Sequence, residues 1–152
     1  MIFKNSINNK LGVLFLIAVI SLFTSCSKGG DSPAPTPPPP TPVAEADISF
    51  KVEIAGSEVN YTSVFAVVGN SVVMNANISS TLPKDGVTVD VTVKKKSDNS
   101  SVFSSNTSST SASNAVTITG LVPGVLCVAT VTVTSKSKST NTLVKTFELA
   151  SK

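Results

Sequence analysis

The chain has 152 residues and a formal charge of +3, so it allows one domain of ordinary size once removable segments are subtracted. All twelve basic residues are lysine, and the chain contains no His, Arg or Trp. These absences exclude histidine-based catalysis and histidine-ligated metal sites. They also disfavour nucleic-acid binding, because the bidentate arginine contact to phosphate or guanine is missing and the charge is small.

The first predicted element is a targeting signal over residues 1–25. Lys4 and Lys10 precede the apolar run Leu11–Phe23. This run is too short to cross a bilayer, because a spanning helix needs about 20 apolar residues. We therefore expect export with cleavage of the signal rather than a permanent anchor helix.

The residues before Cys26 resemble the lipobox of bacterial lipoprotein signal peptides, in which a leucine and two small residues precede a cysteine. Thr24 and Ser25 match the small residues, and Phe23 stands where that family has leucine. The resemblance implies that Cys26 becomes the acylated N-terminus, and two or more acyl chains hold a protein firmly in a membrane. The alternative is an incidental thiol after an ordinary secretory signal.

The segment Ser27–Asp31 resembles the polar tags of Bacteroidetes-type lipoproteins, in which acidic residues are associated with transfer to the cell surface. The single acidic residue here is Asp31. The resemblance implies an outer-membrane protein exposed at the cell surface, and the periplasmic face of that membrane is the alternative.

Most of the nine prolines lie between Pro33 and Pro42. An extended polyproline segment rises about 3.1 Å per residue, so this one would hold the next domain roughly 30 Å from the membrane. Residues 26–43 are therefore interpreted as lipidated cysteine, tag and stiff spacer. A ligand for proline-recognition modules is the alternative, although an exported bacterial protein rarely meets such modules.

Residues 44–152 are rich in Val, Thr, Ser and Ile, and apolar residues repeatedly alternate with polar ones. Turn signals divide them into about seven short strands. Strands with one apolar face need a partner layer, and without a predicted helix that layer must be a second sheet, so we expect a β-sandwich. The residues predicted to face the core are Ile48, Phe50, Val52, Ile54, Val72, Met74, Ala76, Ile78, Val87, Val89, Val91, Val93, Val116, Ile118, Cys127, Ala129, Val131 and Val133.

The segment Thr117–Val131 resembles a corner of fibronectin type III and related immunoglobulin-like domains, with the pattern Leu-x-Pro-x-x-x-Tyr-x-Val-x-Val. Leu121, Pro123 and Val131 match the pattern, whereas Cys127 stands at the tyrosine and Ala129 at the first valine. The resemblance implies an immunoglobulin-like sandwich of about seven strands over residues 44–152. It implies nothing about a ligand.

Cys127 falls on the core-facing positions of an alternating strand, so we expect it to be a small buried hydrophobic residue. A reactive thiol or an intermolecular disulfide is the alternative. Lys94–Lys96 is interpreted as a solvated strand edge rather than a patch for an anionic ligand. The stretch Ser97–Ser113 is predicted to be a flexible connection or a ligand-facing loop, with Val102 and Phe103 as a short edge strand at most.

No catalytic residue, metal site or cofactor is predicted. The acidic residues Glu45, Asp47, Asp85 and Asp90 lack the spacing of a calcium loop, and no serine has a recognisable general base.

Two function classes remain. The first is a non-catalytic immunoglobulin-like domain that binds a protein partner in the cell envelope. The second is carbohydrate binding, for which Tyr61 and Phe103 are the candidate ligand-binding residues because they are the aromatic side chains we expect to be exposed.

Overall fold

The computed structural model describes residues 43–152, and within that range it contains nine strands and no helix. The predicted signal peptide, Cys26 and all of the predicted spacer except Val43 lie outside the described residues. No helix in residues 43–152 is long and apolar enough to cross a membrane.

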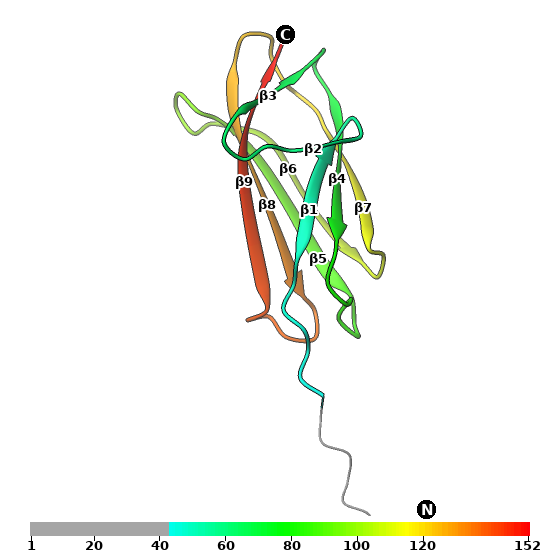
Figure 1. The fold of residues 1–152 in the computed structure, drawn as a ribbon. Helices are drawn as coiled ribbons and strands as arrows, with labels where there is room; N and C mark the ends of the chain where they lie inside the picture. The colour runs from blue at the N-terminus through cyan, green and yellow to red at the C-terminus, as the bar shows by residue number, and fades with distance from the viewer. Residues whose placement is uncertain (1–42) are drawn as a thin grey trace, which may run out of the picture. The chain divides into compact units, whose positions relative to one another are not determined.

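The strands form two sheets that pack as a sandwich (Figure 1), which confirms the predicted all-β architecture. The four-stranded sheet has the order β2-β1-β4-β7, and the five-stranded sheet has the order β3-β9-β8-β5-β6. All neighbours are antiparallel except β3 and β9. The bounds are β1 (Phe50–Ile54), β2 (Ser57–Glu58), β3 (Val64–Val67), β4 (Val72–Ile78), β5 (Val87–Lys95), β6 (Ser101–Ser109), β7 (Ser113–Ile118), β8 (Leu126–Ser135) and β9 (Thr142–Ser151).

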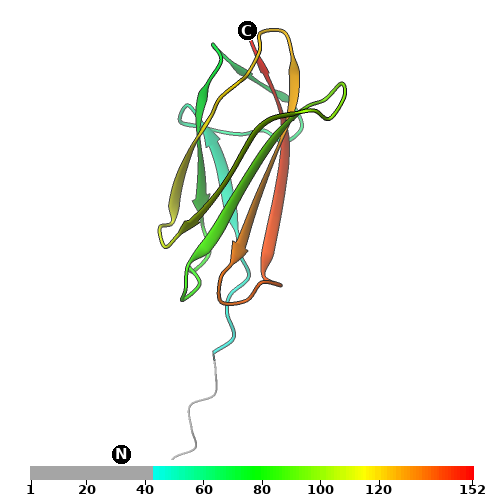
Figure 2. The ribbon, with the colours of Figure 1, turned by 180° about the vertical axis from the view of Figure 1, so that it is seen from behind.

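The chain enters the sandwich at one end, which we call the base, and Lys152 lies at the other end, which we call the tip (Figures 1 and 2). The connections β4–β5, β6–β7 and β8–β9 lie at the base, whereas β3–β4, β5–β6 and β7–β8 lie at the tip. The incoming chain and the C-terminus therefore lie at opposite ends of the domain.

A buried amide holds the incoming chain at the base. The Asn141 side chain accepts a hydrogen bond from the Ile48 amide at 2.9 Å and donates to the Ala46 carbonyl at 2.9 Å and to Glu45 Oε1 at 2.6 Å. Its own backbone carbonyl accepts from the Ser135 amide, so the same residue closes the β8–β9 connection. We call this group of bonds the Asn141 clasp.

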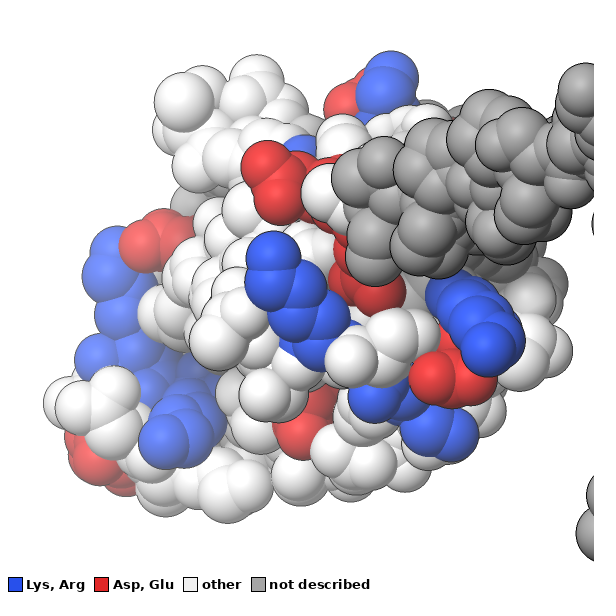
Figure 3. Space-filling view, turned by 90° about the horizontal axis from the view of Figure 1, so that it is seen from below, with Lys and Arg blue, Asp and Glu red and all other residues white. Residues whose placement is uncertain are grey.

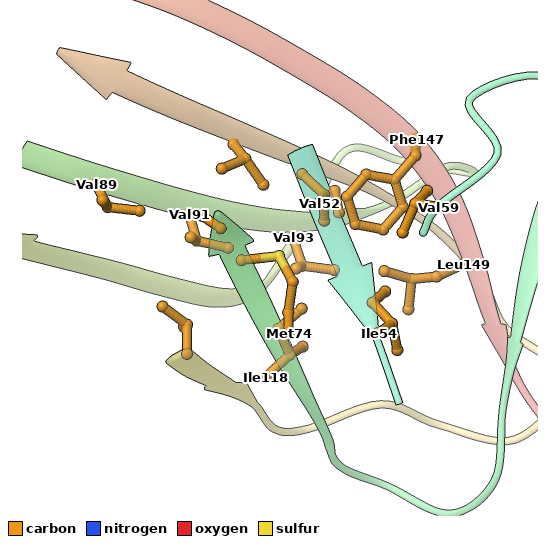
Figure 4. Packing of buried hydrophobic residues seen from close by; sticks show 14 of the residues in the cluster. Val52, Ile54, Val59, Met74, Val89, Val91, Val93, Ile118, Phe147 and Leu149 are labelled. Carbon is orange, nitrogen blue, oxygen red and sulfur yellow. The ribbon is translucent and has the colours of Figure 1, made fainter. Parts of the chain in front are cut away.

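The core lies between the two sheets, and period-two alternation places its side chains there. Every residue predicted above to face the core is buried, apart from Val72, which is partly buried. Met74 and Ile118 of the four-stranded sheet lie close to Val91 and Val93 of the five-stranded sheet (Figure 4). Burial on this scale is the main stabilising contribution, at roughly 25 cal/mol per Å² of apolar surface.

Two short strands were not predicted. Strand β2 returns along β1 through a two-residue turn in which Ala55 and Gly56 both have positive φ, 50° and 78°. A tight hairpin of this kind needs both central residues in the left-handed region, which glycine adopts without steric cost. Strand β3 pairs in parallel with the last residues of β9, a long-range contact that alternation along one strand does not indicate.

The prediction for Ser97–Ser113 is wrong. Most of this stretch is β6, which pairs with β5 in regular register from Phe103 to Ser109 and has one irregularity opposite Val93 and Lys94. Its small polar side chains hid the strand, because an edge strand with little burial on either face has no alternation. The turn before it is built by Asp98, whose side chain accepts from the Ser100 amide at 2.9 Å. These hydrogen bonds hold the pKa of Asp98 below its usual range.

Candidate functional site

A hollow in the described surface lies beside Tyr61. It has a volume of about 320 Å³ and combines an aromatic ring, hydroxyl groups and one carboxylate. We call it the Tyr61 hollow, and its lining residues are Tyr61, Thr62, Ser63, Val64, Val128, Thr146, Phe147 and Glu148.

The β2–β3 loop forms one wall of this hollow and is fixed at two points. The buried Val59 donates its amide to the Val52 carbonyl at 2.9 Å, which ties the loop to β1. Asn60 Oδ1 accepts from the amide of Thr62 at 3.0 Å and from its hydroxyl at 2.8 Å, so the loop turns sharply at Tyr61. Tyr61 is therefore presented by a structured turn.

Lys145 supports the Tyr61 ring from β9. Its Nζ lies 4.8 Å from the centroid of the Tyr61 ring and 5.4 Å from that of the buried Phe50 ring. Cation–π contacts of this kind are worth about 0.5–1 kcal/mol at exposed sites. The lysine thus links the loop to β1 and β9.

The two aromatic candidates lie at opposite edges of the five-stranded sheet. Tyr61 is 37% exposed and lies at the β3–β9 edge, as the sequence predicted for an exposed ring. Phe103 lies on β6 and packs against the core, so its predicted exposure is wrong. The reason is register: Phe103 is the partner of Val93, and paired residues share one face of a sheet. The structure does not bring these two side chains together.

Cys127 is buried as predicted, and it forms no disulfide within residues 43–152. Burial raises the pKa of its thiol, and nearby Lys95 opposes that shift to a smaller extent. A thiol with a raised pKa is mostly protonated at neutral pH and is a poor nucleophile. The side chain therefore acts as core packing.

The other charged candidates are spread over the surface. Lys96 pairs with Glu148 beside the Tyr61 hollow, and Lys94 is exposed. Lys51 pairs with Glu58 at 2.9 Å between β1 and β2, and this hydrogen-bonded partner raises the pKa of Lys51. Within residues 43–152, no three His, Cys, Asp or Glu side chains gather closely enough to hold a metal ion.

The two sides of the sandwich have different edges. On the side of β1 and β9, the edge strands β2 and β3 have only two and four residues, and charged side chains accompany them. On the other side, β6 has nine residues and β7 has six, and no charged residue occurs between Asp98 and Lys136. Short strands and charges are how sheets protect their edges from pairing with other chains. The β6–β7 side lacks both protections, although this difference was not predicted from the sequence.

No protein-family profile matches this chain, and no curated protein is significantly similar to it in sequence.

Proposed function

We propose that this chain is an outer-membrane lipoprotein that displays a non-catalytic immunoglobulin-like interaction domain at the cell surface. The interaction role rests on one observation, the long uncharged edge of β6. Strand edges of this kind bind other chains through main-chain hydrogen bonds. The predicted acylated Cys26 supports the membrane anchor.

The strand order supports an immunoglobulin-like fold. If the two shortest strands, β2 and β3, are set aside, the first, second and fifth of the remaining strands form one sheet and the other four form the second. Immunoglobulin constant-type sandwiches likewise place their first, second and fifth strands in one sheet and their third, sixth and seventh in the other. Leu121 is buried at the corner before β8, and its amide donates to the Asn70 carbonyl at 3.0 Å. Cys127 occupies the place of the corner tyrosine, so a phenolic hydrogen bond is replaced here by packing.

The chemistry of the groups in the Tyr61 hollow supports the non-catalytic role. The Tyr61 hollow contains the Ser63 hydroxyl and the Glu148 carboxylate, and the carboxylate is paired with Lys96. A serine nucleophile needs a base that is free to accept its proton, so this pair is a poor catalytic arrangement. The hollow is better suited to contact than to reaction.

The anchor is tested by radiolabelled palmitate in cells that express the full chain. We expect the wild-type protein to be labelled and membrane-bound, and Cys26→Ser to lose both properties. A Cys26→Ser protein that is still labelled would refute the anchor. Protease added to intact cells should remove the domain if it is displayed outside, whereas full protection would place it on the periplasmic face.

The carbohydrate alternative is tested on a glycan array with the mature protein and its Tyr61→Ala variant. Tyr61 is the exposed aromatic ring at the hollow, and an aromatic face is what a sugar would stack on. We expect no strong binding by either protein. Strong binding that disappears in Tyr61→Ala would overturn the protein-interaction proposal in favour of carbohydrate recognition.

A further inference from the structure

We propose that two copies of this chain associate through β6, antiparallel and edge to edge, so that their five-stranded sheets join into one continuous sheet. The inference rests on the proposed interaction role and names the partner as a second copy of the same chain.

The first argument is that the outer side of β6 is open. β6 ends the five-stranded sheet, and its pairing with β5 is regular from Phe103 to Ser109. Within residues 43–152 no strand pairs with its other side. Alternate amide and carbonyl groups along this side therefore point away from the sheet, as a ladder for one more strand.

The second argument is the contrast with the opposite edge of the same sheet. There, β3 covers only the last residues of β9, from Glu148 to Ser151. Further towards the base, Lys145 extends from β9 to the Phe50 and Tyr61 rings. A lysine at this edge would lose its solvation if another strand covered it. β6 carries no charged residue, and its single irregularity lies at one end, beside Val93 and Lys94.

The third argument concerns the identity of the added strand. Two identical strands repel each other where like charges lie opposite one another, and β6 carries no charged side chain. Lysines and acidic residues nearly balance over residues 43–152, and both signs are interspersed on the surface seen from the base (Figure 3), so little net repulsion opposes self-association. The chain's own spacer is a poor occupant, because the prolines between Pro33 and Pro42 have no amide hydrogen to donate.

The fourth argument is the register. A two-fold axis at Asn106 places Asn106 opposite its symmetry mate, Ser104 opposite Ser108, and Ser105 opposite Thr107 in the other copy. Each pair then joins small side chains that can exchange hydrogen bonds, which is a favourable cross-strand combination. Asn106 also donates to Asp90 Oδ2 at 2.7 Å, so its side chain is held on the outer face of the sheet. The interface is self-complementary, as a two-fold dimer requires.

The experiment uses the full chain in intact cells, with cysteine introduced at the proposed axis. In Asn106→Cys, two copies would place their thiols directly opposite each other, at a separation that a disulfide can bridge. Oxidation with copper phenanthroline should then give a disulfide-linked dimer on a non-reducing gel. The matched control is Thr117→Cys, an exposed residue on the uncharged edge strand β7. We expect several-fold more dimer from Asn106→Cys.

Two charge variants in the Asn106→Cys background test the register. Ser104→Lys with Ser108→Lys places lysines opposite each other at both pairs, whereas Ser104→Glu with Ser108→Lys places opposite charges there. We expect the first to lose most of the cross-link and the second to keep it. Equal cross-linking by these two variants would overturn the proposal, and so would no excess over Thr117→Cys or a cross-link to a different protein. Palmitate labelling of Asn106→Cys is read in parallel, so failure of self-pairing is distinguishable from failure of the anchor.

Discussion

Strands β5 and β6 are neighbours of equal length, paired along most of that length, yet their side chains lie in opposite environments. β5 has four valines that are 0–1% exposed, whereas β6 has no buried residue. Both are extended because of the hydrogen bonds they share, but only β5 is held by burial as well. The comparison separates two causes of strand formation that usually act together: an apolar face and a neighbouring ladder of backbone groups.

The difference in burial between β5 and β6 also explains why the edge of the sheet at β6 is open to other chains. β6 belongs to a five-stranded sheet that faces a four-stranded one. Its inward side therefore receives less cover than β5, and polar residues such as Ser105 are tolerated there. A strand with little burial contributes little to the core, and its backbone edge remains open for other contacts.

The largest loss of stability is expected at Val91 of β5, and the matched control is Ser105, its partner on β6. Val91→Ala removes fully buried methyl groups and should lower the free energy of unfolding by about 2 kcal/mol. Ser105→Ala should change it by no more than about 0.5 kcal/mol. Urea denaturation followed by circular dichroism measures both. Equal costs would show that β6 is held by packing as strongly as β5.

An intermediate loss of stability is expected at Phe103, which with Val102 is one of two β6 residues that pack against the core. Because the ring is only partly buried, Phe103→Ala should cost about 1–2 kcal/mol, well below the roughly 3–5 kcal/mol of a fully buried phenylalanine. The same denaturation experiment measures it. A loss as large as that of a fully buried ring would place Phe103 in the main core.

The smallest effect on stability is expected from ionisation of the Cys127 thiol. Its reactivity compares a buried position on β8 with an exposed position on β6. Because burial raises the pKa of Cys127, the thiol loses its proton at a lower pH in the unfolded chain than in the folded one. The stability that the thiol contributes is therefore present below the ordinary thiol pKa of about 8.5 and is lost as the pH rises above it. Below that pH, iodoacetamide should label native Cys127 far more slowly than an added cysteine in Ser104→Cys. Peptide mapping by mass spectrometry compares the two sites. Equal labelling rates would mean that β8 opens as readily as the edge.

The sequence was informative for strands that bury one face, because their apolar and polar residues alternate. It predicted the two-sheet architecture, the inward valines of β5 and the burial of Cys127. It did not reveal β6, because a polar edge strand has no periodic signal, and it mistook Phe103 for an exposed ring for the same reason. The Asn141 clasp also left no local signal, because its partners lie more than ninety positions earlier in the chain.

In the Tyr61 hollow too, one feature was predicted from the sequence and another depends on distant parts of the chain. The sequence predicted that Tyr61 is exposed, but its contact with Lys145 depends on how the β2–β3 loop lies beside β9. The position of the loop is set by the parallel pairing of β3 with β9 and by the burial of Val59. Long-range pairing of this kind is decided by the whole sandwich and cannot be read from one segment.

The Asn141 clasp has a consequence for a domain that is pulled. Tension applied through the incoming chain reaches Ala46 and Ile48 before it reaches β1, and the amide of Asn141 passes part of that load to the β8–β9 connection in the other sheet. Both sheets then share the first displacement, because Asn141 belongs to the connection between β8 and β9. The hydrogen bonds of one side-chain amide at the base therefore take up load before the β1–β4 ladder does.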